Sequence, residues 1–165
     1  LYKNETDTYG DYVSECILET DLEILIPDKY VTDIAERLSI YRELDQIESD
    51  TELESYRLQL LDRFGKVPPQ THALLDAIRL RWIAKELGFE KLTLKSGKMI
   101  GFFVSDQNSG YYQSDSFSRM LDFIKTNPAG YKMYEKSGSL RRSKTQVTSI
   151  ADAIEALNGV LEMSY

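Results

Sequence analysis

The residue types that most often carry out catalysis or bind metals are scarce in this chain of 165 residues. It contains one cysteine, Cys16, and one histidine, His72. A single thiol forms no internal disulfide and supplies no cysteine-based zinc site, and one imidazole leaves no histidine pair. We therefore expect no metal site, and we interpret both residues as structural or simply exposed.

Motifs that bind phosphates or activate a nucleophile are also missing from the sequence. Gly65–Lys66 and Gly97–Lys98 are isolated dipeptides without the glycine spacing of a phosphate-binding loop. Carboxylates such as Glu52 and Glu54 fall in the first turn of an expected helix, where negative charge complements the helix dipole. The sequence thus predicts no catalytic residue and no cofactor. A small enzyme stays as a third alternative, which ATP hydrolysis by the chain would revive.

One basic cluster has residue types suited to nucleic acids. Arg141, Arg142 and Lys144 place three cations in four residues, and Tyr131 and Tyr134 nearby offer rings for stacking on bases. Cations on an edge strand also discourage unwanted strand pairing, and we prefer that second interpretation. An accessory DNA-binding module that uses these three cations stays as the alternative function.

The charge of the chain is unevenly distributed. The net charge is −7, with −12 over residues 1–55 and +5 over residues 56–165. An acidic first third repels nucleic acid, whereas it suits docking on a basic protein surface. The longest apolar stretch, Met99–Val104, is far shorter than the roughly 20 residues of a membrane-spanning helix, and the start lacks a secretory signal. We expect a cytoplasmic chain without a membrane partner, cut from a longer protein because it opens on Leu1.

The hydrophobic pattern predicts helices first and a small sheet afterwards. Residues 1–20 are acidic without periodicity and are interpreted as a linker or strap from a preceding module, and residues 21–165 as one domain. A short strand over residues 22–26 is expected to end at Pro27. Apolar spacing then predicts helices over residues 30–47, 49–65 and 69–87, which form an antiparallel cluster.

The second half alternates in the manner of β-hairpins. Hairpins are predicted over residues 91–104 and 131–147, with helices over residues 116–125 and 149–157, the last capped by Asn158–Gly159. The fold class is therefore α+β: an N-terminal antiparallel helical cluster followed by small antiparallel β-hairpins with packed helices.

The segment from Leu58 to Pro69 is the most distinctive local sequence. Helical spacing places Leu61 and Phe64 on the buried stripe and directs Gln59, Asp62 and Arg63 outward. An exposed polar pair beside a corner made rigid by glycine and proline suits a docking surface as well as an ordinary helix end.

This segment reads L-x-D-R-F-G-x-x-P, and residues 26–41 read I-P-D-x-Y-V-x-D-I-x-x-R-L-S-x-Y. Both motifs, in this order, resemble the C-terminal domain of the bacterial transcription-repair coupling factor. The resemblance covers residues 22–159 and is densest over residues 26–87.

The resemblance implies a regulatory domain of an ATP-dependent DNA translocase. In that family the domain packs on an N-terminal UvrB-like module and covers the surface used by UvrA, and engagement with RNA polymerase releases it. The ATP site and the DNA-binding motors lie in other domains. By motif position Asp62 corresponds to an acidic contact residue, and Gln59 stands where relatives can carry Glu. The implied contact set is Gln59, Asp62 and Arg63.

Overall fold

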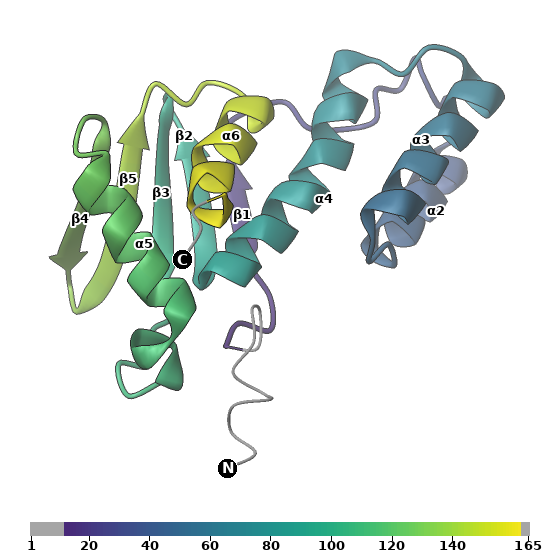
Figure 1. Ribbon diagram of the computed structural model, residues 1–165. Helices are drawn as coiled ribbons and strands as arrows, with labels where there is room; N and C mark the ends of the chain where they lie inside the picture. The colour runs from purple at the N-terminus through teal and green to yellow at the C-terminus, as the bar shows by residue number, and fades with distance from the viewer. Residues whose placement is uncertain (1–11, 163–165) are drawn as a thin grey trace. The chain divides into compact units, whose positions relative to one another are not determined.

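The computed structural model describes residues 12–162, which divide into two compact units (Figure 1). Unit 1 comprises the chain up to Leu22 and again from Leu80 onward, and unit 2 comprises Glu23–Arg79. Unit 2 is therefore inserted in the connection between the first and second strands of unit 1.

Unit 1 is built on one five-stranded sheet. In spatial order its strands are β1 (Ile17–Thr20), β2 (Phe89–Lys95), β3 (Lys98–Phe103), β5 (Ser139–Thr145) and β4 (Tyr131–Lys136). β1 pairs with β2 in parallel, and every other pairing is antiparallel. The α+β prediction is confirmed, and the two predicted hairpins are joined edge to edge, because β3 pairs with β5.

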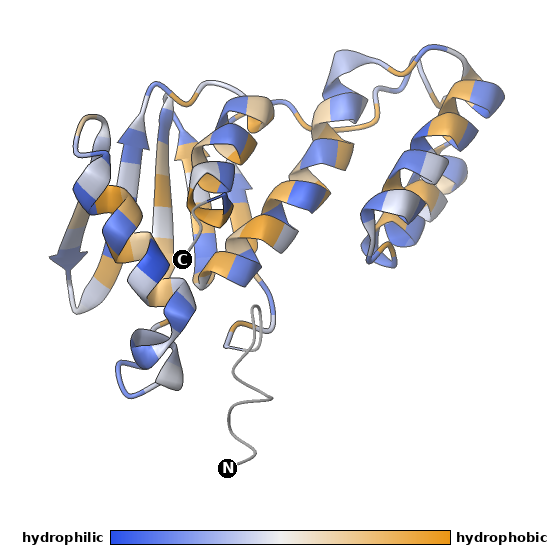
Figure 2. Ribbon diagram, viewed as in Figure 1, coloured by the Kyte–Doolittle hydropathy of each residue, from blue (hydrophilic) through white to orange (hydrophobic). Residues whose placement is uncertain are grey.

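One face of this sheet, the inner face, is packed against helices. α5 (Asp115–Thr126), α6 (Ile150–Leu161) and the final turns of α4 (Pro69–Leu87) lie on the viewer's side of the sheet in Figure 1. Figure 2 shows hydrophobic residues along α4, α6 and the central strand β3. The inner-face residues of the central strands are buried: Leu92, Leu94, Met99, Gly101, Phe103 and Arg142.

The helices of unit 1 begin at serine caps. Ser114 and Ser149 each accept a hydrogen bond from a backbone amide three residues later, at the starts of α5 and α6. A short 3-10 helix, η1 (Gly110–Gln113), precedes α5. The predicted end of α6 at Asn158–Gly159 is wrong, because the helix continues through Gly159. A Cβ there would lie 2.8 Å from Cε1 of Phe123, so the glycine serves close packing instead of a cap.

Unit 2 consists of α2 (Ile34–Asp45), α3 (Asp50–Phe64) and the first turns of α4. A capping box begins α3: Ser49 Oγ accepts from the Glu52 amide at 3.2 Å and lies 3.1 Å from Glu52 Oε1. Gly65 ends the helix with φ +86°, a backbone conformation that favours glycine.

The predicted strand over residues 22–26 is wrong. In this segment the amides of Leu25 and Ile26 donate to the Gln70 carbonyl and to Tyr41 Oη, which are partners within unit 2 and not in a sheet. A strand forms earlier, at Ile17–Thr20, inside the segment predicted to be a linker or strap. Residues 1–11 of that segment lie outside the described residues. No helix in the described part is long and apolar enough to cross a membrane.

Candidate protein-docking surface

The end of α3 is held by the side chain of Tyr30. Its hydroxyl donates to the carbonyl oxygens of Leu60 and Gly65 at 3.0 and 2.9 Å. Its ring meets Phe64 edge to face, with 5.7 Å between the ring centroids. These contacts fix the backbone just before the D-R-F-G motif and at its last residue.

The start of α2 is fixed by three further residues of the upstream motif. Asp33 caps the helix by accepting from the Ala35 amide at 2.9 Å. Arg37 donates to the Val31 carbonyl at 2.6 Å, and Tyr41 accepts the Ile26 amide at 2.9 Å. The conspicuous residues of both motifs therefore shape the corner of unit 2 itself.

A salt bridge joins α3 to α2 across this corner. Arg63 Nη2 lies 2.6 Å from Glu36 Oε1, and the guanidinium also stacks on the Phe64 ring at 4.8 Å. At the other end of the helix pair, the Tyr56 hydroxyl donates to Glu43 at 2.7 Å. Burial, reinforced by this carboxylate, raises the pKa of the Tyr56 phenol. Glu36 and Glu43 thus border the surface, and sequence reasoning missed them because only tertiary contacts bring them beside α3.

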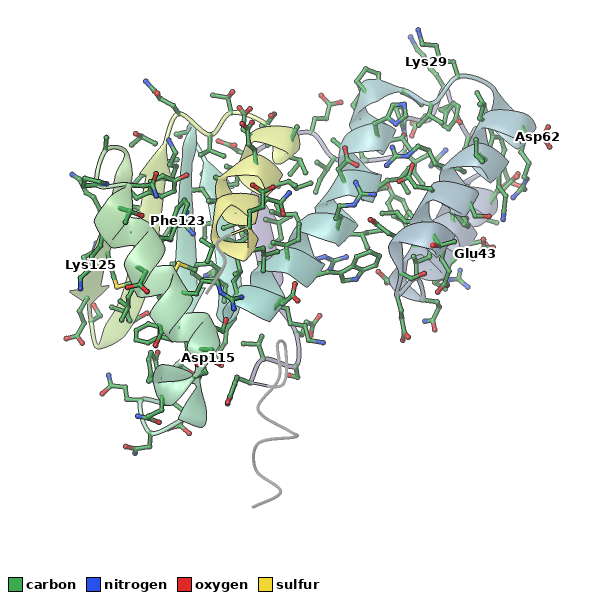
Figure 3. The ribbon with its side chains drawn as sticks, viewed as in Figure 1. Lys29, Glu43, Asp62, Asp115, Phe123 and Lys125 are labelled. Carbon is green, nitrogen blue, oxygen red and sulfur yellow. The ribbon has the colours of Figure 1, made fainter. Side chains whose placement is uncertain are left out.

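Gln59 and Asp62 are exposed on α3, as predicted. In Figure 3 the Asp62 side chain projects outward near the end of the helix, and within the described part of the chain it forms no ion pair. We define the docking surface as Glu36, Glu43, Gln59, Asp62 and Arg63. Its charges are three carboxylates and one guanidinium, which leaves it acidic.

The buried stripe of α3 differs from the predicted one. Leu61 is 50% exposed and Leu58 is 65% exposed, whereas Leu53 and Leu60 are buried. The prediction for Leu61 is therefore wrong: the helix is rotated so that Leu60 faces the core. Leu61 and Asp62 are neighbours in sequence, so a partner bound at Asp62 also has apolar area within reach.

An ion-pair network holds α3 against the first turns of α4. Arg57 pairs with Asp76 at 3.0 Å, and Arg79 pairs with Asp50 at 2.7 Å and Glu54 at 2.9 Å. Burial opposes ionisation of Glu54, but hydrogen bonds from both arginines outweigh it and lower the pKa of this carboxyl. The network makes α3 a rigid support for the surface.

The basic cluster of β5 is not one surface patch. Arg142 is only 1% exposed, so this side chain is not presented for nucleic acid contact. Strand alternation places Arg142 and Lys144 on the inner face and Arg141 on the opposite face. The structure therefore does not bring the three predicted contact residues together.

Arg142 is enclosed by α5, α6 and β4. It donates to the Ala156 carbonyl at 3.1 Å, and its guanidinium stacks on Tyr131 at 4.6 Å and on Phe123 at 5.4 Å. Figure 3 labels Phe123 on α5. Burial lowers the pKa of Arg142 to about 10. Arg142 is therefore part of the core of unit 1. The sequence does not indicate this, because the residues around Arg142 are polar.

The histidine and the cysteine, the two residues most suited to catalysis or metal binding, lie in different units. His72 is exposed on α4, where Nδ1 lies 2.5 Å from Arg57 Nη1, and Cys16 is buried in unit 1. Burial raises the pKa of the Cys16 thiol to about 12. Among residues 12–162, no group of three or more His, Cys, Asp or Glu side chains is placed to hold a metal ion.

Unit 2 is helical with an acidic, rigidly supported surface, and unit 1 is a sheet with helices on one face, so the chain has an α+β fold. The family model named TRCF domain matches residues 20–114, more than half of the chain. The chain therefore belongs to the TRCF domain family.

Relatives named transcription-repair-coupling factor include those of Rickettsia bellii and Escherichia coli. The first is 30% identical over 113 residues, covering 68% of this chain and 9% of the relative. The second is 38% identical over 78 residues, covering 45% of this chain and 7% of the relative. This chain thus corresponds to about a tenth of the length of these relatives.

Among solved structures, the chain is similar to the C-terminal domain of a transcription-repair coupling factor. The TM-score is 0.67 at 19% identity, with 90% of this chain and 92% of the other covered. The shared fold extends beyond the family-model match into the second half of unit 1.

Proposed function

We propose that this chain is a non-catalytic regulatory domain of a transcription-repair coupling factor. Its docking surface binds the N-terminal UvrB-like module of the same protein and masks the surface used by UvrA. The full-length protein is then an ATP-dependent DNA translocase that removes stalled RNA polymerase and recruits excision repair, with its ATP and DNA sites in other domains.

The observation that carries this proposal is the position of Asp62. It is exposed, it has no ion-pair partner in the described part of the chain, and it stands on a helix whose end is fixed by Tyr30 and Arg63. A carboxylate held in one place and left unpaired loses little entropy when it meets an arginine or lysine of a partner. Gln59, one turn earlier, adds a hydrogen-bonding group on the same side of the helix.

The regulation follows from competition between two binding events. An interface between domains of one chain typically buries 600–1,500 Å² and stays separable. While the domain is docked, the surface that UvrA binds is covered. The apparent affinity for UvrA is then the affinity of the open form multiplied by the fraction of molecules that are open. Any event that binds the open form, such as engagement with polymerase, shifts this balance.

Calorimetric titration of this chain into the UvrB-like module of its full-length protein tests the proposal. We expect micromolar or tighter binding. Asp62→Ala should weaken it by about 2–5 kcal/mol if the carboxylate meets a desolvated arginine. Asp45→Ala is the matched control, because Asp45 is an exposed carboxylate at the far end of α2 with no ion pair in the described part of the chain.

UvrA serves as the competitor in the same assay. Displacement of this chain by UvrA, together with loss of affinity in Asp62→Ala and not in Asp45→Ala, supports the masking function. Absence of binding at high concentration, or equal weakening by both substitutions, refutes docking through this surface. Binding that UvrA does not displace refutes masking and retains docking.

A further inference from the structure

The second face of the unit 1 sheet, the open face, is not used by the proposed docking. The pairing registers assign every second residue of the strands to it. Figure 1 shows α5 and α6 on the opposite side of the sheet. Its members are half-buried or exposed apart from Ser143. They are Ile17, Glu19, Lys91, Thr93, Lys95, Lys98, Ile100, Phe102, Lys132, Tyr134, Lys136, Ser139, Arg141, Ser143 and Thr145.

Cations and rings alternate in one row across this face. The registers place Lys91 opposite Phe102, Phe102 opposite Arg141, and Arg141 opposite Tyr134. Lys91 Nζ lies 5.2 Å and Arg141 Cζ lies 4.6 Å from the centroid of the Phe102 ring. The row therefore combines positive charge with aromatic surface on four adjacent strands.

The open face carries six cations and one carboxylate. The carboxylate, Glu19, is held by Lys91 at 2.9 Å. The other five cations form no ion pair within the described residues: Lys95, Lys98, Lys132, Lys136 and Arg141. In unit 2, by contrast, four of the arginines are paired with carboxylates. The charges of the open face are thus left available to a polyanion.

We propose that the open face binds single-stranded nucleic acid. Unpaired cations spread over adjacent strands match a chain of phosphates, and half-buried rings among them offer surface for stacking with bases. A DNA duplex presents no free base faces, so the aromatic members of the row would contribute nothing to its binding. An acidic protein would use the cations, but it would gain nothing specific from the alternation of rings and charges.

Fluorescence anisotropy with the whole chain tests this inference. The probes are fluorescein-labelled oligothymidylate and oligouridylate of twelve nucleotides at 50 mM salt. Three to five phosphate contacts predict that affinity falls roughly 20- to 130-fold between 50 and 200 mM salt. The ratio of the affinities for oligothymidylate and oligouridylate shows whether the face prefers single-stranded DNA or single-stranded RNA.

Two double variants locate the surface. Lys98→Glu with Lys132→Glu reverses two charges of the open face and should weaken binding at least tenfold. Lys29→Glu with Lys66→Glu makes the same change of net charge on exposed residues of unit 2 and should change binding less than threefold. Tyr134→Leu removes a ring without changing charge and should weaken binding about fivefold or more.

Each contrary result overturns the proposal. If neither oligonucleotide binds at about 100 μM protein, the site is rejected. That concentration is, in order of magnitude, the weakest dissociation constant typical of non-specific binding. Equal losses in both double variants mean that only net charge matters. Equal affinity for a twelve-base-pair duplex rejects the preference for single strands. Displacement by a polyglutamate peptide of the same charge, with no effect of Tyr134→Leu, assigns the face to an acidic protein instead.

Discussion

Arg63 Nη2 lies 2.6 Å from Glu36 Oε1, so the last turn of α3 is tied to the first turn of α2. Arg63 is therefore paired within unit 2, whereas its neighbour Asp62 forms no ion pair among residues 12–162. Of the two adjacent charges in the D-R-F-G motif, the arginine orients the helix end, and the carboxylate is the one that our proposal assigns to a partner. This division of roles separates effects on stability from effects on binding.

Substitution of these two neighbours should reveal the division. Arg63→Ala removes an exposed salt bridge and a ring contact, and it should lower the free energy of unfolding by about 1 kcal/mol or less. Asp62→Ala should leave it within about 0.5 kcal/mol, because the exposed carboxylate forms no ion pair or side-chain hydrogen bond with residues 12–162. Urea unfolding followed by circular dichroism measures both. A larger loss for Asp62→Ala than for Arg63→Ala would contradict these roles.

The Tyr30 hydroxyl should contribute more to the free energy of unfolding than the side-chain charge of Asp62 or of Arg63. Tyr30→Phe removes a hydroxyl that donates to two carbonyls at the end of α3, at 3.0 and 2.9 Å, and leaves the ring in place. We expect a loss of about 1–2 kcal/mol in the free energy of unfolding. Tyr134→Phe is the control, because the Tyr134 hydroxyl forms no hydrogen bond with residues 12–162, and this substitution should leave the free energy of unfolding unchanged. Equal stability of the two variants would show that the Tyr30 hydroxyl does not hold the corner.

Local signals made the helical half of this fold predictable. The Ser49 capping box, Gly65 with φ +86° and the prolines at the start of α4 act within a few residues of sequence, and all three mark helix boundaries in the structure. The outward direction of Gln59 and Asp62 followed from the same helical spacing. Elements that are fixed by neighbours in sequence can be predicted from sequence.

Features that depend on distant partners were not predictable in this way. β1 exists because Ile17–Thr20 pairs in parallel with Lys91–Leu94, more than seventy residues later. Arg142 is buried because α5 and α6 close over it, although the letters around it are polar. Leu61 is exposed although it is hydrophobic, because the packing of α3 in unit 2 turns Leu60 toward the core instead.

Gly88 should tolerate no side chain. Its φ is +98°, and a Cβ there would lie 2.2 Å from the ring of Tyr111, whose hydroxyl donates to the Leu87 carbonyl at 2.6 Å. Gly88→Ala combines backbone strain with a clash against a fully buried ring, and we expect a loss of about 3 kcal/mol or more. Gly138→Ala has a similar φ of +76° but open space around the new methyl, so it should cost only about 1 kcal/mol. Thermal unfolding of the two variants separates clash from strain, and similar melting temperatures would disprove the clash.

The Cys16 thiol should make stability depend on pH in the alkaline range. Burial raises its pKa to about 12 in the folded chain, from 9.0 for the free group. Below pH 9 both states hold the proton and the thiol has no effect. Between pH 9 and 12 only the unfolded state ionises, so the free energy of unfolding falls by about 1.4 kcal/mol per pH unit. Urea unfolding of the parent chain and of Cys16→Ala at pH 8, 9, 10 and 10.5 isolates this effect, and parallel curves for the two proteins would contradict it.

Arg142 tests whether a buried charge stabilises or destabilises the core of unit 1. Its guanidinium is buried against Tyr131, Phe123 and the Ala156 carbonyl, and within the described residues no carboxylate pairs with it. Nε is buried without a hydrogen-bond partner in the same part of the chain. The ion therefore bears a desolvation cost that stacking and the hydrogen bonds to the Ala156 carbonyl and Met120 Sδ only partly offset.

Two substitutions separate the charge of Arg142 from its packing. Arg142→Met keeps a long flexible side chain against the rings and removes the buried charge, so the free energy of unfolding should stay within about 1 kcal/mol or rise. Arg142→Ala removes the packed stem as well and leaves a cavity, so it should cost about 2–4 kcal/mol. Urea unfolding measures both. If methionine proves as damaging as alanine, the hydrogen bond to Ala156 and the stacking of the cation outweigh the cost of burying the charge.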